Sequence, residues 1–367
     1  TGSGRILGVW AYSGPKYAFR NNAGGTAAVM WKSSASGWTA VSLGYELDFT
    51  SGGTTEIVAG NTITGATSGA TAVVGRVITT SGTWAAGDAA GRFILTSQTG
   101  TFQAENVNVG ASLNLATIAG NSSAITLSPS GYYDFINHNF YGASASLRMY
   151  GVDGVNRAFE FDGTVFTPID TGMTTDTPTH LFAYKKHLFL AFPGGSVQHS
   201  STGEPITFDA ISGAAEIAIG EEVTGFGSSP DALPIFGRNK TAILYGSSTL
   251  DWNLTTHSET SGAIEWTIQS LGRPMYLDDP GLTDLQAVQA YGNFADNAFS
   301  EKIRPLLKSK IALACASVTI RNKSQYRIFF TDNSGIIATF NKGKLVGFAR
   351  IDYGKVVRCA CSVEDSS

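Results

Sequence analysis

The chain has 367 residues, of which 43% are hydrophobic and only 15% are charged. So small a charged fraction excludes a disordered chain held open by its own charge, and it excludes a coiled coil. The formal net charge of −4 provides no basic footprint for specific nucleic-acid binding, and no segment approaches the run of about 18 apolar residues that a membrane helix needs.

Short strands separated by tight turns are predicted along most of the chain. Its 43 glycines show no three-residue period, which indicates many turns rather than a collagen-like helix. Aromatic and β-branched residues cluster in short segments, and Asn- and Gly-rich turns such as 21–25, 153–154 and 341–343 lie between such segments. The predicted strands include residues 16–20, 28–32, 157–161 and 326–330. The fold class is therefore predicted to be mainly all-β.

A segment of different composition, residues 50–129, interrupts the N-terminal strands. It is poor in charge and dense in Gly, Ala, Thr, Ser and Val. We predict a small inserted β domain whose core is supplied by Trp84, Phe93 and Phe102, between residues 1–49 and 130–367 of a larger body. Trp10, Trp31 and Trp38 are expected in the core of that larger body.

Outside the insert, loosely similar units recur, each with apolar strands, a turn and a polar loop. A spacing of about 30–50 residues is typical of stacked four-stranded blades, so we predict a propeller-like body. The units lie near residues 6–43, 145–170, 180–208, 232–268, 285–340 and 344–366. Because the first and last units start and end within a predicted blade, sequence is expected to be missing at the ends.

One stretch, residues 300–316, has apolar residues at helical spacing with an early proline, and it is predicted to be a helix. Residues 282–290 are a weaker helix candidate. The first helix is either an ordinary surface helix packed on a sheet or a dedicated subunit contact. For the second case, the candidate interface residues are Arg304, Lys308 and Lys310.

The sequence contains no motif of a nucleophilic, phosphate-binding or zinc site. The five histidines are isolated in sequence. Cys359 and Cys361 are expected to alternate on one strand face as small core residues, with a soft-metal site that includes Cys315 as the lesser alternative. We predict no cofactor, no metal site and no disulfide.

Adjacent carboxylates are the remaining candidates for catalysis, because glycan-cleaving enzymes use two carboxylates that flank a glycosidic bond. The adjacent pairs are Asp278–Asp279, Glu221–Glu222 and Glu364–Asp365. Neighbours on a strand face opposite ways, so adjacency alone gives no catalytic geometry. The chain is predicted not to be an enzyme, with a glycan-degrading enzyme as an alternative.

Several segments resemble structural proteins of tailed bacteriophages. The insert, with Gly-Ala-Thr-Ser-Gly-Ala-Thr-Ala at 65–72 and related segments at 91–95 and 100–105, resembles a small β module that recurs in such proteins. The flanking body is similar to the tail nozzle, or tail tubular, proteins of short-tailed phages. The segments that carry this second resemblance are 186–191, 198–200, 203–205, 236–239 and 326–330.

The resemblance implies a non-enzymatic virion protein, located in the phage tail. It implies a ring of subunits, commonly six, that lines the DNA exit channel below the portal and adaptor. The implied partners are further copies of the chain, other tail proteins such as the adaptor and fibres, and DNA in non-specific transit, with no insertion into a membrane. A weakly charged acidic wall fits a conduit that must not hold DNA. The alternative is a receptor-binding or fibre-anchoring tail adhesin that presents the insert.

Overall fold

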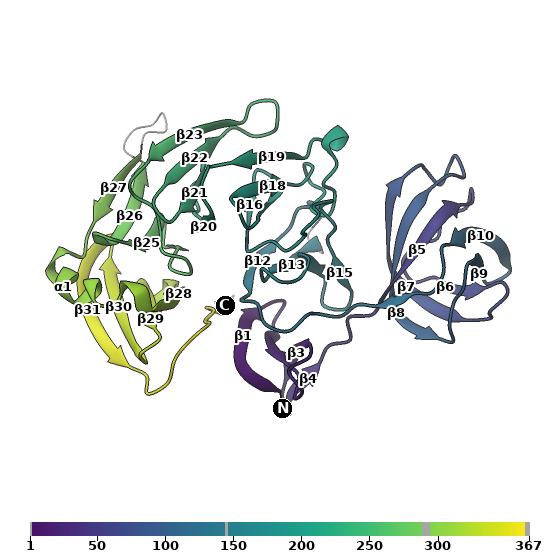
Figure 1. The fold of residues 1–367 in the computed structure, drawn as a ribbon, viewed down its shortest axis with the longest axis horizontal. Coiled ribbons are helices and arrows are strands. Elements are labelled where there is room, and N and C mark those ends of the chain that lie inside the picture. Colours follow the sequence, from purple (N-terminus) through teal and green to yellow (C-terminus); the bar gives the residue numbers. More distant parts are fainter. Residues whose placement is uncertain (1, 144–145, 288–293, 364–367) are drawn as a thin grey trace. The chain divides into compact units, whose positions relative to one another are not determined.

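The computed structural model describes residues 2–143, 146–287 and 294–363 (Figure 1). Within these ranges the protein is built almost entirely from β-strands, as predicted. None of the helices in the described ranges is long and apolar enough to span a bilayer. The chain forms two compact units: Thr1–Thr39, Ser128–Ala158 and Ile169–Ser367 make the first, and Ala40–Leu127 with Phe159–Pro168 makes the second.

Six four-stranded antiparallel sheets follow one another along the chain as the blades of a propeller, which confirms the predicted fold class (Figure 1). Each blade is a meander in which strands adjacent in sequence are hydrogen-bonded neighbours. Blade 1 consists of β1 (Ser3–Ala11), β2 (Lys16–Asn21), β3 (Ala28–Ser34) and β4 (Gly37–Ala40). Blade 2 consists of β12 (Asp134–His138), β13 (Arg148–Val152), β14 (Phe159–Phe161) and β15 (Phe166–Pro168). Blade 3 consists of β16 (His180–Tyr184), β17 (His187–Ala191), β18 (Ser196–His199) and β19 (Ala215–Ala218). Blade 4 consists of β20 (Val223–Phe226), β21 (Leu233–Gly237), β22 (Thr241–Tyr245) and β23 (Asn253–Ser258). Blade 5 consists of β24 (Gln269–Ser270), β25 (Pro274–Asp278), β26 (Gly281–Ala287) and β27 (Phe294–Ala298). Blade 6 consists of β28 (Ala314–Ile320), β29 (Gln325–Phe330), β30 (Ser334–Asn341) and β31 (Lys344–Asp352).

The propeller core lies between the faces of neighbouring blades. The second strands of blades 3, 4 and 5 are buried along their whole length, whereas β23 and β31 at the outer edge are largely exposed or half-buried. A strand covered on both faces needs apolar residues on both faces, so these middle strands are nearly continuous apolar runs. Large clusters of buried side chains join blade 3 to blade 4 and blade 5 to blade 6.

Two of the six predicted repeat units were wrong. Residues 285–340 span parts of two blades, and the described part of 344–366, up to residue 363, holds only β31 followed by a segment without strands. Blades 5 and 6 are joined by a connection with short helical turns between β27 and β28. This connection was counted as part of a blade, so the last two predicted units did not match the blades. Trp38 was also misplaced, because its side chain on the outer strand β4 is 51% exposed, and Trp10 and Trp31 are only half-buried.

The predicted helices were largely wrong. Residues 300–316 contain only one short α-helix, α1 (Arg304–Lys308), between the 3-10 turns η3 (Glu301–Ile303) and η4 (Ile311–Leu313), and they end in β28. The apolar spacing instead lets Leu307 pack beneath α1 on the core shared by blades 5 and 6. The first part of the weaker candidate, 282–290, is strand β26, and its last three residues lie outside the described ranges. Two further short turns are η2 (Ala210–Ser212) and η5 (Arg321–Lys323).

Residues 40–127 of the second unit form a closed β-barrel. Its strands pair in the order β10-β9-β6-β7-β8-β5, and β10 also pairs with β5, which closes the circuit. Trp84, Phe93 and Phe102 lie in its buried core, as predicted. Closure leaves the barrel strands without free edges, and free edges are the usual sites of aggregation. The strands are β5 (Tyr45–Gly52), β6 (Thr62–Gly65), β7 (Thr71–Ser81), β8 (Ala90–Thr99), β9 (Glu105–Val109) and β10 (Ser112–Ile118), with β11 (Ser123–Ala124) added to β5.

The Gly-Ala-Thr-Ser-Gly segment forms a turn that is closed on a single carboxylate. The backbone N–H groups of Thr67 and Ser68 donate to Glu105 Oε2 at 2.6 and 2.8 Å, and the Ser68 hydroxyl donates to Glu105 Oε1. Burial opposes the charged form of Glu105, but these hydrogen bonds outweigh it and lower its pKa. A Cβ on Gly65 would collide with Ser68 Oγ and Glu105 Oε1, so a larger residue there would displace the two side chains that close the turn.

Candidate functional site

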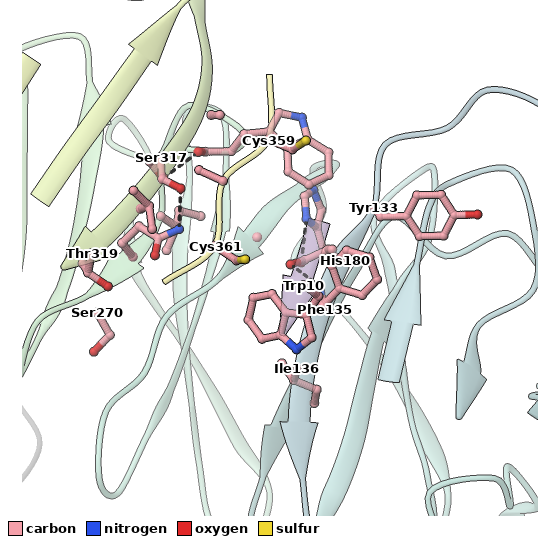
Figure 2. A pocket seen from close by; sticks show the side chains of 18 of the residues that line it. Trp10, Tyr133, Phe135, Ile136, His180, Ser270, Ser317, Thr319, Cys359 and Cys361 are labelled. Atoms are coloured by element: carbon pink, nitrogen blue, oxygen red, sulfur yellow. Dashed lines mark hydrogen bonds and ion pairs between the residues drawn. The ribbon is translucent and has the colours of Figure 1, made fainter. Parts of the chain in front are cut away.

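A cavity of about 630 Å3 lies at the centre of the propeller (Figure 2). The innermost strands of all six blades line it, together with a C-terminal segment that carries Cys359 and Cys361. Because strand residues alternate between faces, the first strand of each blade can place some side chains in the cavity and others in the core. On β12, for example, Phe135 is buried while Asp134 and Ile136 are partly exposed.

A buried histidine between two carboxylates is the charged centre of the cavity wall. His180 Nδ1 lies 3.4 Å from Asp134 Oδ2, and His180 Nε2 lies 3.2 Å from Glu265 Oε1. Burial by itself lowers the pKa of His180, but hydrogen bonds and Coulomb attraction from the two carboxylates outweigh burial and raise the pKa to about 9. The imidazole is therefore protonated at neutral pH, so it cannot act as a general base.

Trp266 covers this charged group. Its ring lies 4.8 Å from the ring of His180 and 4.1 Å from that of Tyr132, measured between centroids. The Trp266 backbone has φ +66°, an uncommon conformation for a large side chain, and its carbonyl accepts a 2.8 Å hydrogen bond from Ser317 Oγ. Strained backbone that is held in place by its surroundings, here by Ser317 of blade 6, clusters at ligand-binding and active sites.

The C-terminal segment lies against blade 6. Cys315 Sγ on β28 is 3.4 Å from the carbonyl oxygen of Val357, and Val357 packs with the apolar side chains of β28 and β29. The prediction that Cys359 and Cys361 share a strand face was wrong, because the segment forms no strand and both side chains line the cavity. Burial, together with Cys361, raises the pKa of Cys359 to about 11, so it is a neutral thiol rather than a reactive thiolate.

The sequence-predicted interface residues lie at the connection between blades 5 and 6. Arg304 and Lys308 are exposed on α1, so both charges are available at the surface. Lys310 follows α1 and is different: its ammonium group pairs with Asp332, which is in the turn between β29 and β30. None of the three lines the central cavity.

The carboxylate pairs take structural positions. Asp278 is 3% exposed, accepts a hydrogen bond from Ser261 and pairs with Arg238, which also pairs with Asp279. Glu221 accepts hydrogen bonds from the backbone and side chain of Asn239. The third pair, at residues 364 and 365, lies outside the described residues. In the described ranges, no group of three His, Cys, Asp or Glu side chains is arranged to hold a metal ion.

Sequence reasoning missed His180 and its carboxylate partners. Asp134 and Glu265 are 46 and 85 residues away from His180, so no local motif joins the three. In the structure Asp134 and His180 begin the first strands of blades 2 and 3, and Glu265 lies just before that of blade 5. Only His180 coincides with the start of a predicted unit, so no signal in the sequence joins the three residues.

No family model matches the chain, and no curated protein matches it. Solved structures with similar folds include YCF48 bound to D1 peptide, with 8% identity, a TM-score of 0.37 and coverage of 59% of this chain and 70% of that one. Apo AztD from Citrobacter koseri has 6% identity, a TM-score of 0.37 and coverage of 88% of this chain and 83% of that one. BamB from Moraxella catarrhalis has 9% identity, a TM-score of 0.39 and coverage of 84% of this chain and 87% of that one. Likeness at this level concerns the fold and carries no statement about function.

Proposed function

We propose that this chain is a non-enzymatic structural protein of a tailed-phage virion. It forms a ring of subunits in the tail nozzle, around the channel through which DNA leaves the particle. Its partners are further copies of itself and neighbouring tail proteins, and it contacts DNA only in transit.

The observation that carries the proposal is the turn closed on Glu105. The two segments of the insert that resemble the recurrent phage module, 65–72 and 100–105, meet in this turn. Gly65, Ser68 and Glu105 all take part in it, since a Cβ at 65 would collide with the carboxylate and the other two supply its hydrogen bonds. The resemblance therefore concerns a structural device, as expected of a module used for its shape.

Charge and architecture also support the proposal. The chain has a formal charge of −4 and few charged residues, so a wall built from it repels DNA phosphates weakly and does not retain them. The carboxylate pairs of the described residues are tied to Arg238 and Asn239 rather than facing each other across the cavity. An assembly protein functions through broad surfaces, and α1 offers two exposed cations, Arg304 and Lys308, for such a surface.

The mass of the purified protein in solution tests the proposal. We expect a ring of about six subunits, because head-to-tail contacts close when their rotation divides a circle. A protein that remains monomeric across the concentrations at which tail proteins assemble contradicts the proposal. A trimer contradicts the ring and favours the fibre-anchoring or adhesin alternative.

The surface around α1 can be tested separately. The double variant Arg304→Glu with Lys308→Glu should weaken ring assembly at low salt, because it reverses two exposed charges. Lys323→Glu with Lys342→Glu, which changes two exposed lysines elsewhere on the propeller by the same net charge, is the matched control. If both variants assemble equally well, α1 is not part of the subunit interface. That outcome does not test the ring itself, which the mass measurement tests.

A further inference from the structure

One wall of the central cavity is a fixed aromatic surface. Trp10 stacks on Phe135 with a centroid distance of 5.7 Å and an interplanar angle of 21° (Figure 2). Its indole Nε1–H donates to Asn137 Oδ1 at 2.9 Å, and the Asn137 amide donates to the carbonyl of Ala11 at 2.8 Å. Trp10 is held in one orientation yet remains only half-buried, so part of its ring stays free for contact.

The wall formed by blades 5 and 6 carries polar groups. Ser270 at the end of β24 and Thr319 on β28 are half-buried, and their hydroxyl groups have no hydrogen-bond partner within the part of the chain that the structure describes. Both lie on the side of the cavity opposite Trp10 (Figure 2). Gln269 donates its amide N–H to the Ser317 carbonyl at 3.3 Å, which leaves its own amide oxygen as an acceptor.

The charges at the cavity balance one another. Both ring nitrogens of His180 face carboxylate oxygens, so both must donate and the ring is an imidazolium. The lining contains Asp134, His180 and Arg321, and Glu265 contacts His180 from outside the lining, so these four groups carry two negative and two positive formal charges. A cavity whose formal charges sum to zero provides no force that selects an ion.

We propose that the central cavity binds a neutral saccharide unit. A pyranose ring presents an apolar C–H face and a rim of hydroxyl groups, which match the Trp10 surface and the opposite wall with Ser270, Thr319 and Gln269. The cavity of about 630 Å3 is of the size that small-molecule sites usually have. A purely apolar ligand would bury these hydroxyl groups without partners, which opposes its binding. The inference does not depend on the proposed role in a phage tail.

Titration of the full chain with D-glucose, D-galactose and N-acetyl-D-glucosamine tests the proposal, with tryptophan fluorescence and saturation-transfer NMR as readouts. A single sugar of this size should bind with a dissociation constant of about 1 mM, by the affinity typical per non-hydrogen atom. Trp10→Ala should weaken binding by about 10-fold or more, because it removes the stacking surface. Trp38→Ala is the matched control, since Trp38 lies in the same blade but does not line the cavity.

Thr319→Val is the second variant, because it removes a hydroxyl group with almost no change in volume. We expect it to weaken binding by about 3- to 10-fold while the thermal midpoint stays unchanged. If Trp10→Ala does not fold, this variant decides: full affinity in folded Thr319→Val overturns the proposal. Absence of saturable binding for all three sugars at about 20 mM also overturns it. So does tighter binding of a charged sugar such as glucosamine or N-acetylneuraminic acid.

Discussion

The propeller has two buried histidines whose pKa values are shifted in opposite directions. His180, at the central cavity, lies between Asp134 and Glu265, and its pKa is raised to about 9. His199, at the end of β18, is fully buried and is hydrogen-bonded to the Ser200 carbonyl and the Trp252 indole; burial and the nearby His187 lower its pKa. The first histidine is kept charged by its partners, whereas the second is kept neutral by its burial.

Hydrogen bonds hold the neutral site in one tautomer. His199 Nδ1 donates to the Ser200 carbonyl at 3.1 Å, and His199 Nε2 accepts from the indole N–H of Trp252 at 3.0 Å. His187 donates to the same Ser200 carbonyl through Nδ1 at 2.6 Å. The indole group can only donate, so a proton on His199 Nε2 would break this network. The difference teaches that the partner atoms, and not burial alone, decide whether a buried histidine carries charge.

The largest effect is expected at the neutral site. His199→Leu leaves the indole N–H of the half-buried Trp252 without its acceptor, which should lower the free energy of unfolding by about 2 kcal/mol. His199→Gln, which can retain an acceptor, should lose clearly less. Urea unfolding followed by circular dichroism measures both. Equal losses in the two variants would show that packing, rather than the Trp252 hydrogen bond, stabilises this site.

At the charged site the expected loss is smaller. His180→Leu leaves two carboxylates without their cation, but Asp134 and Glu265 are 34% and 48% exposed, so water takes over part of their solvation. We expect the free energy of unfolding to fall by about 1 kcal/mol, as measured by the same urea unfolding. A loss larger than that of His199→Leu contradicts the comparison.

The two sites should respond to pH in opposite directions. The raised pKa of His180 makes its contribution to stability complete below pH 6.5, the ordinary pKa of histidine, and lost as the pH rises through about 9. The lowered pKa of His199 makes its contribution complete above pH 6.5 and lost as the pH falls below that value. Urea midpoints between pH 5 and pH 10 should show a flatter alkaline limb in His180→Leu and a flatter acid limb in His199→Gln. Identical pH profiles in both variants and the parent contradict both assignments.

The smallest effect concerns the pKa of His180 itself. Glu265→Gln removes one of its two carboxylate partners, so the pKa of His180 should fall below about 9 while Asp134 keeps it above that of a lone buried histidine. An NMR titration of the imidazole resonances measures the shift. Glu259→Gln is the control, because Glu259 is 67% exposed and pairs with Lys240 rather than with His180.

The β fold and the barrel core were predictable from sequence because the signals are local. Alternating apolar residues indicate strands, and Asn and Gly mark turns; Gly25 and Gly154, for instance, have φ +69° and +75°. Trp84, Phe93 and Phe102 are large apolar residues in a small, weakly charged segment, so little else could fill its core. Residues 300–316 misled the prediction because apolar spacing that suits a helix equally suits a broken turn packed on a sheet.

The amino-acid sequence by itself determined that the chain is made of short strands, that one segment differs from the rest, and that Asn and Gly mark the turns. These follow from side-chain period and backbone freedom, which act over a few residues. Only the tertiary structure decided where the blades begin, that Asp134 and Glu265 meet His180, and that a segment without strands lines the cavity. Contacts between residues that are 46 or 85 positions apart depend on how whole blades pack, and no local pattern contains that information.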